Sequence, residues 1–429
     1  MIALVLLAAG FTYPDIGATA LGRGATGAAQ GTGDLASVLY NPAGLVEVRG
    51  LRLQADVSSA FQSLDFTRAC ATCGTVSNSG GAFLNTVTGV SWEARRGLVF
   101  AASVYGPPSI GRETFPDPRV VRPSKAPQRY SLISSDDVII YPGVAAAWRA
   151  LPWLDVGAVV QVRYFRAHHV QSIFSVGGVG GDIPDLDAVV DADATDRARL
   201  TGGLGVTVRP LAGLSLGLSA RPSEPVHATG TLAVTLPSFA AAAGASVEGN
   251  AARIDLRLPA QARLGVRYER GAASGEVDAT WENWGSLDAF TVTPVGVLLH
   301  QGGTTQPVGP IAIPRRWHAA FSVRAGGEYT LGPATLRAGA LVEQSAIPDE
   351  TLQIDFVNVQ RAAATLGATL RHRGLAVTAG WAHFFPVQRT VTTSTVTRTD
   401  PYDAPAFVIG NGTYSTSLDV VALQLAASL

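Results

Sequence analysis

The sequence predicts an all-β fold, namely a 14-stranded antiparallel transmembrane β-barrel with an N-terminal hatch inside its lumen. Three observations lead to this prediction. From Leu51 onward apolar and polar residues alternate with the period of a strand. The connections between strands alternate between long and short along the chain. No run of about 18 apolar residues occurs, which excludes transmembrane helices.

Composition narrows the function classes. The chain has 429 residues, of which 47% are hydrophobic and 15% charged, and its formal net charge is −1. A nucleic-acid-binding protein would carry a basic face, which this balance does not provide. The high apolar content also excludes a disordered chain.

Three regions are expected. Residues 1–9 are the remnant of a signal peptide, because an apolar run ends in Ala8, Ala9 and Gly10 but lacks a basic start. Residues 10–48 form the hatch, and residues 49–429 form the barrel. The hatch region is rich in Gly and Ala, and few large side chains interrupt it.

A Gly-x-Gly-x-x-Gly pattern at Gly22, Gly24 and Gly27 resembles a dinucleotide-binding loop. Such a loop lies between a buried parallel strand and a helix, and neither is predicted around it. We therefore interpret these glycines as positions of close packing inside a barrel, where no side-chain volume is available.

The strands show the alternation directly. Leu51, Leu53, Val57 and Phe61 alternate with polar residues, and the same pattern recurs along the chain. We expect strands near 51–61, 83–92, 97–106, 138–149, 153–165, 199–209, 213–221, 253–269, 275–287, 315–325, 334–343, 361–371, 375–385 and 415–429.

The order of the connections favours a barrel over a soluble sandwich. Short turns at 93–96, 150–152, 210–212, 270–274, 326–333 and 372–374 alternate with long loops at 62–82, 107–137, 166–198, 222–252, 288–314, 344–357 and 386–414. All long loops then lie at one end and both termini at the other. This layout is typical of integral barrels in the outer membrane of Gram-negative bacteria. Closure is required because lipid offers no partner to an unpaired sheet edge.

Seven tryptophans fall mostly near strand ends, where an indole ring can lie at the level of the lipid head groups. We expect these residues to form an aromatic girdle. Apolar side chains should face lipid, and the inward Arg, Gln, Asp and Thr side chains should line a polar lumen.

No catalytic or metal site is predicted, and no cofactor. Cys70 and Cys73 are expected to form a short disulfide in an external loop, because an exported protein meets an oxidising compartment. Six aspartates between Asp182 and Asp196 are interpreted as a solvated acidic loop. The histidines lack metal-ligand spacing. A hydrolase with strand-borne Ser, His and Asp remains an alternative, because sequence order does not define such a site.

Two long loops carry apolar residues that solvation does not require. Phe174 lies in the third long loop, and Leu236 and Phe239 lie in the fourth. Exposed apolar patches often mark a binding surface, so these three are candidate ligand contacts. Packing of the loops on one another over the barrel mouth is an equal alternative.

Several motifs resemble the FadL/TodX family of outer-membrane transporters for long-chain fatty acids and aromatic hydrocarbons. The most specific is the hatch motif Asn41, Pro42, Ala43, Gly44, which ends a Gly/Ala-rich segment. Ala9-Gly10-Phe11 is similar to the family's mature N-terminus. The similarity continues through Leu21–Gly24 and Asp34–Ser37 to the hatch motif. Weaker similar stretches are Leu258–Val266, Trp281–Trp284, Pro348–Asp349 and Gly412–Tyr414.

The resemblance implies a 14-stranded barrel whose lumen is blocked by the hatch. It implies that ligand meets an apolar groove among the external loops and then a tighter pocket near the hatch, with Phe11 as a further candidate contact. Ligand then leaves sideways beside a kinked third strand, for which Gly106 and Pro107 are the candidate positions. The sequence departs from the family in its final Leu429 instead of an aromatic residue, and no basic residue is assigned to a carboxylate.

The expected function is passive outer-membrane transport of hydrophobic small molecules, such as long-chain fatty acids or similar lipophilic compounds, with lateral release into the membrane. The expected partners are the hydrophobic ligand, outer-membrane lipid and the barrel-assembly machinery, and the expected state is a monomer that binds no nucleic acid. A general diffusion porin and an outer-membrane hydrolase are the alternatives.

Overall fold

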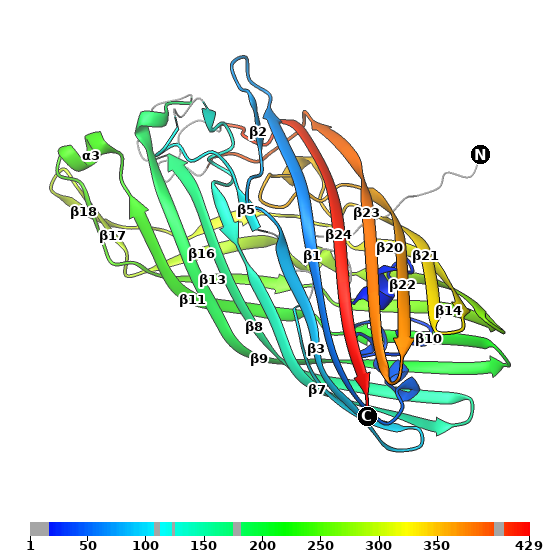
Figure 1. Cartoon of the computed structure of the whole chain (residues 1–429). Coiled ribbons are helices and arrows are strands. Elements are labelled where there is room, and N and C mark those ends of the chain that lie inside the picture. Colours follow the sequence, from blue (N-terminus) through cyan, green and yellow to red (C-terminus); the bar gives the residue numbers. More distant parts are fainter. Residues whose placement is uncertain (1–16, 107–111, 122–124, 175–181, 399–406) are drawn as a thin grey trace.

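The structure is a computed structural model that describes residues 17–106, 112–121, 125–174, 182–398 and 407–429. It is a closed antiparallel β-barrel with fourteen wall positions, as the sequence predicts (Figure 1). We call each position a stave, because some consist of one continuous strand and others of two consecutive strands. The first stave, β1 (Leu51–Arg68), pairs with β3 (Phe83–Arg95) on one side and with the last strand, β24 (Gly412–Ser428), on the other. That last pairing closes the ring and removes the sheet edges.

Four staves are broken into two strands each, whereas the others are continuous. The broken staves are β10 (Leu214–Arg221) with β11 (Glu224–Thr235), β13 (Ala251–Leu258) with β14 (Gln261–Arg270), β15 (Ala273–Glu282) with β16 (Ala289–Val295), and β19 (Ile311–Pro314) with β20 (Ala320–Leu331). The other staves are β4 (Leu98–Tyr105), β7 (Val138–Leu151), β8 (Leu154–Phe174), β9 (Asp187–Leu211), β21 (Ala334–Glu343), β22 (Arg361–His372) and β23 (Leu375–Val391).

Short elements lie in the long loops and, in the case of η4, in the break between β15 and β16. These are β2 (Thr75–Ser77), β5 (Arg112–Thr114), β6 (Ser134–Asp136), η3 (Pro184–Leu186), α3 (Ser238–Ala242), β12 (Ser246–Glu248), η4 (Trp284–Ser286), β17 (Leu298–Gln301), β18 (Thr304–Pro307) and η5 (Asp349–Thr351). A separate sheet of β12, β17 and β18 stands beside the barrel mouth.

The outer face of the barrel carries the apolar belt that the alternation predicts. Leu53, Val57 and Phe61 on β1 are exposed, whereas the intervening Gln54, Asp56 and Ser58 are buried inside. The same arrangement holds on the last strand, where Val421, Leu423 and Leu425 point outward. An apolar exterior of this kind is stable only against lipid.

The alternation changes phase along the barrel axis. On β8 the outward residues are apolar as far as Tyr164 and then become Arg166 and His168. The inward residues change in the opposite sense, from Gln161 and Arg163 to the buried Phe165 and Ala167. The lumen is therefore polar in the half near the short turns and apolar in the half near the long loops. The expectation of a uniformly polar lumen is wrong for the second half.

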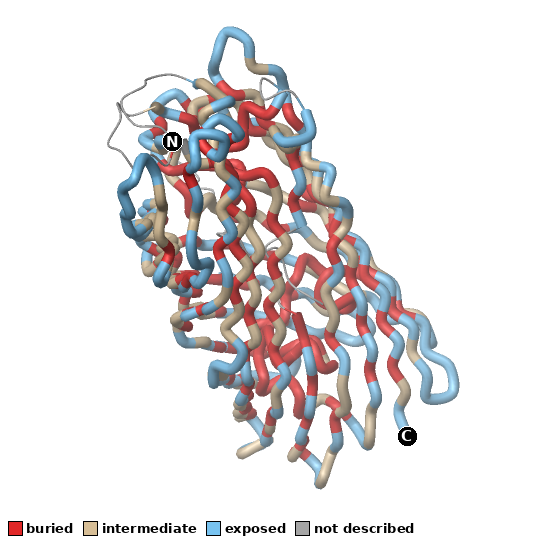
Figure 2. Tube along the Cα trace, turned by 90° about the vertical axis from the view of Figure 1, so that its left-hand side faces the viewer, coloured by how far each residue is buried: buried red, intermediate tan, exposed pale blue. Residues whose placement is uncertain are grey.

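Inside the polar half lies a compact segment of small residues, which we call the hatch segment (residues 17–48). It contains α1 (Ala18–Leu21), α2 (Ser37–Tyr40) and η1 (Pro42–Glu47). Nearly all of its residues are buried, and it runs within the ring of strands near the short turns (Figures 1 and 2).

Two of the predicted loops are mostly strand. The third long loop is short, because β8 continues to Phe174 and β9 starts at Asp187. The prediction of a solvated acidic loop is therefore wrong, because several of its aspartates form ion pairs. The nitrogen–oxygen distances are 2.6 Å between Arg129 and Asp187 and 3.0 Å between Arg68 and Asp182, and Asp193 pairs with Arg166. In the fourth long loop, β11, β12 and the start of β13 together take up slightly more than half of the residues.

Five of the seven tryptophans fall into two groups. Trp92, Trp148 and Trp153 are exposed near strand ends, as a girdle requires. Trp284 and Trp317 are instead buried and pack edge-to-face, with ring centroids 5.5 Å apart. The girdle prediction is wrong for these two. Among the described residues, helices reach neither the length nor the apolarity needed to cross a bilayer.

Candidate functional site

The hatch segment fits against glycines on the inner wall. A Cβ atom on Gly217 would lie 2.0 Å from the carbonyl oxygen of Ala28, and one on Gly265 would lie 2.4 Å from the nitrogen of Ala29. The remaining wall glycines in such contact with the segment are Gly157, Gly205, Gly326, Gly339, Gly367 and Gly380. Only a residue without a Cβ allows backbone to approach this closely.

Glycines of the hatch segment also allow its backbone to lie directly against the backbone of the wall. A Cβ on Gly22 would lie 2.7 Å from Gly367 Cα, and one on Gly24 would lie 2.4 Å from the carbonyl oxygen of Ala325. The interpretation of the Gly-x-Gly-x-x-Gly pattern as close packing therefore agrees with the structure, which has no βαβ unit among its described residues.

Asn41 holds the turn of the hatch motif. Its Nδ2 donates to the carbonyl oxygens of Ala28 at 2.8 Å and Val206 at 3.1 Å, which joins two parts of the segment to the wall. Its Oδ1 accepts from the Ala43 amide at 3.1 Å and caps η1, whose first residue is Pro42. Position 44 requires glycine, because a Cβ atom there would lie 2.3 Å from the Gln30 carbonyl oxygen.

Wall carboxylates satisfy the backbone amides of the hatch segment. Asp278 accepts from the amides of Gly27 at 2.7 Å and Ala28 at 2.9 Å. Glu276 accepts from Ala29 and Asp56 accepts from Ala18. Buried amides need such partners, so the polar residues in this half of the lumen hold the segment.

The apolar half of the lumen opens into a large cavity among the external loops, which we call the outer cavity. Its volume is about 660 Å³. Ile173, Val234 and Leu236 line one side, and the loop from β18 to β19 lines another. A cavity of this size, with mainly apolar walls, is typical of a site for a small organic molecule.

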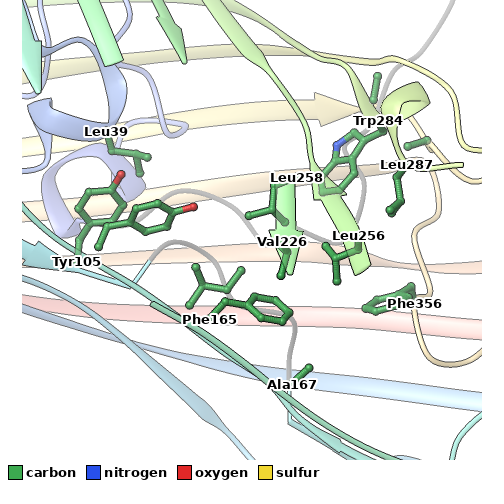
Figure 3. Packing of buried hydrophobic residues seen from close by; sticks show 14 of the residues in the cluster. Leu39, Tyr105, Phe165, Ala167, Val226, Leu256, Leu258, Trp284, Leu287 and Phe356 are labelled. Atoms are coloured by element: carbon green, nitrogen blue, oxygen red, sulfur yellow. The ribbon is translucent and has the colours of Figure 1, made fainter. Parts of the chain in front are cut away.

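A narrower space adjoins it toward the barrel interior. This inner pocket has a volume of about 50 Å³ and shares Gln171, Ile311 and Ile313 with the outer cavity. Phe165 and Phe356 lie in the buried apolar cluster between the barrel mouth and the hatch segment (Figure 3). The other residues that line the pocket are Asp137, Ala167, His169, Val190, Ala192, Leu232, Ile254, Phe290, Val292, Arg315 and Asp355.

A buried ion pair forms part of the wall of the inner pocket. The Nη1 and Nη2 atoms of Arg315 donate to the two carboxylate oxygens of Asp355 at 3.2 and 2.5 Å. The guanidinium lies over the rings of Phe290 and Phe356, at 5.2 and 4.9 Å from their centroids. Burial raises the pKa of nearby Asp137 to about 8. Burial and the charges of Asp355 and Asp137 also raise the pKa of Glu113.

The predicted contact residues are only partly brought together. Leu236 lines the outer cavity, whereas Phe239 is exposed on α3 and is not among the described residues that line it. Phe174 ends β8, but its side chain, like all of Phe11, lies outside the described residues.

Backbone pairing between the described wall strands stops at several places, and two of them bear on a lateral opening. At the first, β4 ends at Tyr105, and the buried Gly106 donates its amide to the Thr86 carbonyl, while Pro107 lies outside the described residues. At the second, backbone pairing between β9 and its neighbouring stave stops at Leu204–Ala220 and resumes at Thr195–Thr229.

The second break coincides with prolines. Pro222 follows β10 and Pro259 follows β13, so both staves lose a ladder donor at the same height. Side chains bridge the gap: Thr201 Oγ1 donates to Glu224 Oε1 at 2.8 Å. A small crevice there is lined by Leu39 and Pro42 of the hatch segment and by Leu204, whose side chain is exposed on the outer face.

The remaining candidates lie away from these cavities. Cys70 and Cys73 are bonded in the loop after β1, with their Cα atoms 5.3 Å apart. The described part of the chain contains no group of three or more His, Cys, Asp or Glu side chains arranged to hold a metal ion.

Comparison with known proteins agrees with this architecture. Residues 1–428 match the family described as "Outer membrane protein transport protein (OMPP1/FadL/TodX)". The chain belongs to this family. It is therefore an integral β-barrel of the bacterial outer membrane. No curated protein matches the sequence.

Solved structures of the FadL/TodX family share the fold at low sequence identity. A FadL homologue from Pseudomonas aeruginosa superposes with a TM-score of 0.81 at 16% identity, covering 98% of this chain and 100% of that chain. The toluene transporter TodX of Pseudomonas putida gives 0.68 at 14% identity, covering 98% and 99%. The toluene transporter TbuX of Ralstonia pickettii gives 0.68 at 14% identity, covering 97% and 98%.

Four residues of the inner pocket carry no sequence pattern that predicts their role, namely Phe290, Arg315, Asp355 and Phe356. Arg315 stands between β19 and β20, and Asp355 lies in the next long loop, so forty residues separate the partners. One sequence feature could have located the pocket. On β8 the apolar residues change from the outward to the inward positions, which indicates where the lumen becomes apolar.

Proposed function

We propose that the chain carries hydrophobic small molecules across the outer membrane by passive diffusion, without a cofactor or a chemical step. The observation that carries this proposal is the apolar lumen between the external loops and the hatch segment. A solute that moves from water into these cavities gains roughly 25 cal/mol for each Å² of apolar surface buried. TodX and TbuX, which have the same fold, are toluene transporters.

Lateral release is the second part of the proposal. The hatch segment fills the polar half of the lumen, and backbone of the wall and of the segment touch at several glycines. This packing argues against a general diffusion porin, which needs an open axial path. A ligand in the apolar half has a shorter route through the wall.

The break beside β9 is the proposed opening. It lacks backbone pairing over eight residues on each side (196–203 and 221–228), and its crevice is lined by residues of both the hatch segment and the outer face. The first break, at Gly106 and Pro107, is the second candidate, because the ladder of β4 ends there.

Ile313 tests the ligand path, because it lines both cavities. The Ile313→Asp variant should bind an apolar fluorescent probe at least about tenfold more weakly, since a buried carboxylate replaces apolar surface. Thr305→Asp, an exposed position on β18, is the matched control. Equal probe affinity in I313D and wild type, with the barrel folded in both, would contradict the proposed path.

A further inference from the structure

Arg315 presents an unpaired donor at the inner pocket. The side chain is almost fully buried, and its two terminal nitrogens bind Asp355. Its Nε atom has no hydrogen-bond partner among the residues that the structure describes. A buried N–H that has given up water without gaining a partner is a favourable position for a ligand acceptor.

The surroundings of the guanidinium restrict the approach to that donor. The rings of Phe290 and Phe356 cover the guanidinium, and Asp355 occupies its terminal edge. Guanidinium N–H bonds lie in the plane of the group. A ligand atom can therefore bind this side chain along the Nε edge.

The charge balance of the pocket disfavours an anion. Asp355 already neutralises Arg315. Asp137 lines the same pocket, and its raised pKa leaves it largely uncharged at neutral pH, so it adds no positive charge for an anion. A carboxylate ligand would have to lose its hydration beside these groups, without an unneutralised arginine or lysine lining the described pocket.

The volumes of the two spaces suit different parts of one ligand, a small terminal group and a larger apolar part. A volume of about 50 Å³ accommodates a small group of a few atoms, whereas the adjoining outer cavity of about 660 Å³ accommodates a chain or ring. The shared walls at Ile311 and Ile313 place the two spaces in sequence.

We propose that the inner pocket selects neutral apolar molecules that carry one uncharged hydrogen-bond acceptor, such as an ester or ketone oxygen, which the Nε–H of Arg315 binds. The acceptor enters the inner pocket and the apolar body stays in the outer cavity. This inference rests on the proposed transport of hydrophobic molecules and defines the substrate class of that site.

The test compares three probes: methyl octanoate, octanoate and undecane. Their binding to protein in an amphipathic polymer is followed by tryptophan fluorescence, because Trp317 packs against Phe356 with ring centroids 5.9 Å apart. Wild type should bind the ester more tightly than the carboxylate. The infrared stretch of the ester carbonyl should move to lower frequency on binding.

Arg315→Lys keeps the positive charge for Asp355 but removes the Nε–H. It should bind methyl octanoate about five- to tenfold more weakly, lose the carbonyl shift and bind undecane as wild type does. Asp355→Asn should improve octanoate binding relative to the ester, since the guanidinium then lacks its counter-charge. Arg253→Lys, an exposed arginine paired with Asp255, is the matched control.

Three outcomes separate the two proposals. Preference for the ester that R315K abolishes supports the inference. Undecane binding without that preference, or an R315K variant that retains it, overturns the inference and leaves the transport proposal intact. Failure of all three probes to bind overturns the proposed transport itself, and with it this inference.

Discussion

Gly217 on β10 and Gly275 on β15 allow a matched test of how the hatch segment is seated. A methyl group on Gly217 would meet the Ala28 carbonyl oxygen at 2.0 Å, whereas one on Gly275 would meet its nearest atom at 3.9 Å. Gly217→Ala should therefore destabilise the barrel by about 1–3 kcal/mol through overpacking, and Gly275→Ala should not. The unfolding midpoint measures the loss, and single-channel conductance should rise in G217A as the segment is displaced. Equal behaviour of the two variants would refute the seating.

The buried carboxyl of Asp137 should make the stability of the folded protein depend on pH. Burial raises its pKa to about 8, so the folded protein holds this proton more tightly than the unfolded chain does. Stability must then fall as pH rises from about 4 to about 8, because the unfolded carboxyl ionises first. Asp137→Asn keeps the acceptor for the His168 amide, at 3.0 Å in the native protein, but does not ionise.

The measurement is the difference in unfolding temperature between D137N and wild type. This difference should increase in favour of the variant from about pH 5 to about pH 8. A difference that stays constant over this range would show that the carboxyl does not titrate as its burial implies.

The strands show how far element-level prediction from sequence can go. Alternation with period two located all fourteen staves, because most strands keep one face in lipid. The same pattern predicted that β8 ends near residue 165, although the strand runs to Phe174. There the outward residues change from apolar to charged as the strand leaves the bilayer, and the inward residues change to apolar. The period persists, but its phase inverts, which resembles the end of a strand.

The candidate site was less predictable for a related reason. Leu236 was identified because apolar residues in a loop are conspicuous. Arg315 and Asp355 were not, because each looks like an ordinary surface charge until folding buries both against Phe290 and Phe356. Long-range pairing of this kind leaves no local pattern.

The break beside β9 is tested by crosslinking across it. Thr201 and Glu224 face each other there, with 2.8 Å between their side-chain oxygens. In the Thr201→Cys/Glu224→Cys variant, a thiol crosslink should stop transport while leaving ligand binding unchanged, and reduction should restore transport. The matched control is Thr280→Cys/Ser322→Cys, which are directly opposite on the intact ladder of β15 and β20. Undiminished transport through the crosslinked break would exclude it as the opening.

At the scale of the whole molecule, the barrel is asymmetric along its axis. Polar side chains and glycines hold the hatch segment in one half, and apolar side chains line cavities in the other. The apolar outer belt does not extend over the whole length of the barrel: on β8 it ends at Tyr164, and the next outward residues are Arg166 and His168. The outer cavity and the inner pocket thus offer an apolar solute two adjoining apolar spaces in one half, while the packed hatch segment fills the other.

The most direct test of this account is solute selectivity in vesicles whose outer leaflet is lipopolysaccharide. A neutral naphthylamine dye that fluoresces in lipid reports entry of an apolar molecule, and an enclosed sugar-binding reporter detects a small sugar. Wild-type protein should accelerate dye entry by at least about tenfold over empty vesicles, since apolar burial lowers the barrier by more than about 1.4 kcal/mol. The sugar should remain outside. Rapid entry of the sugar, or no acceleration of the dye, would contradict transport of hydrophobic molecules through a hatch-closed barrel.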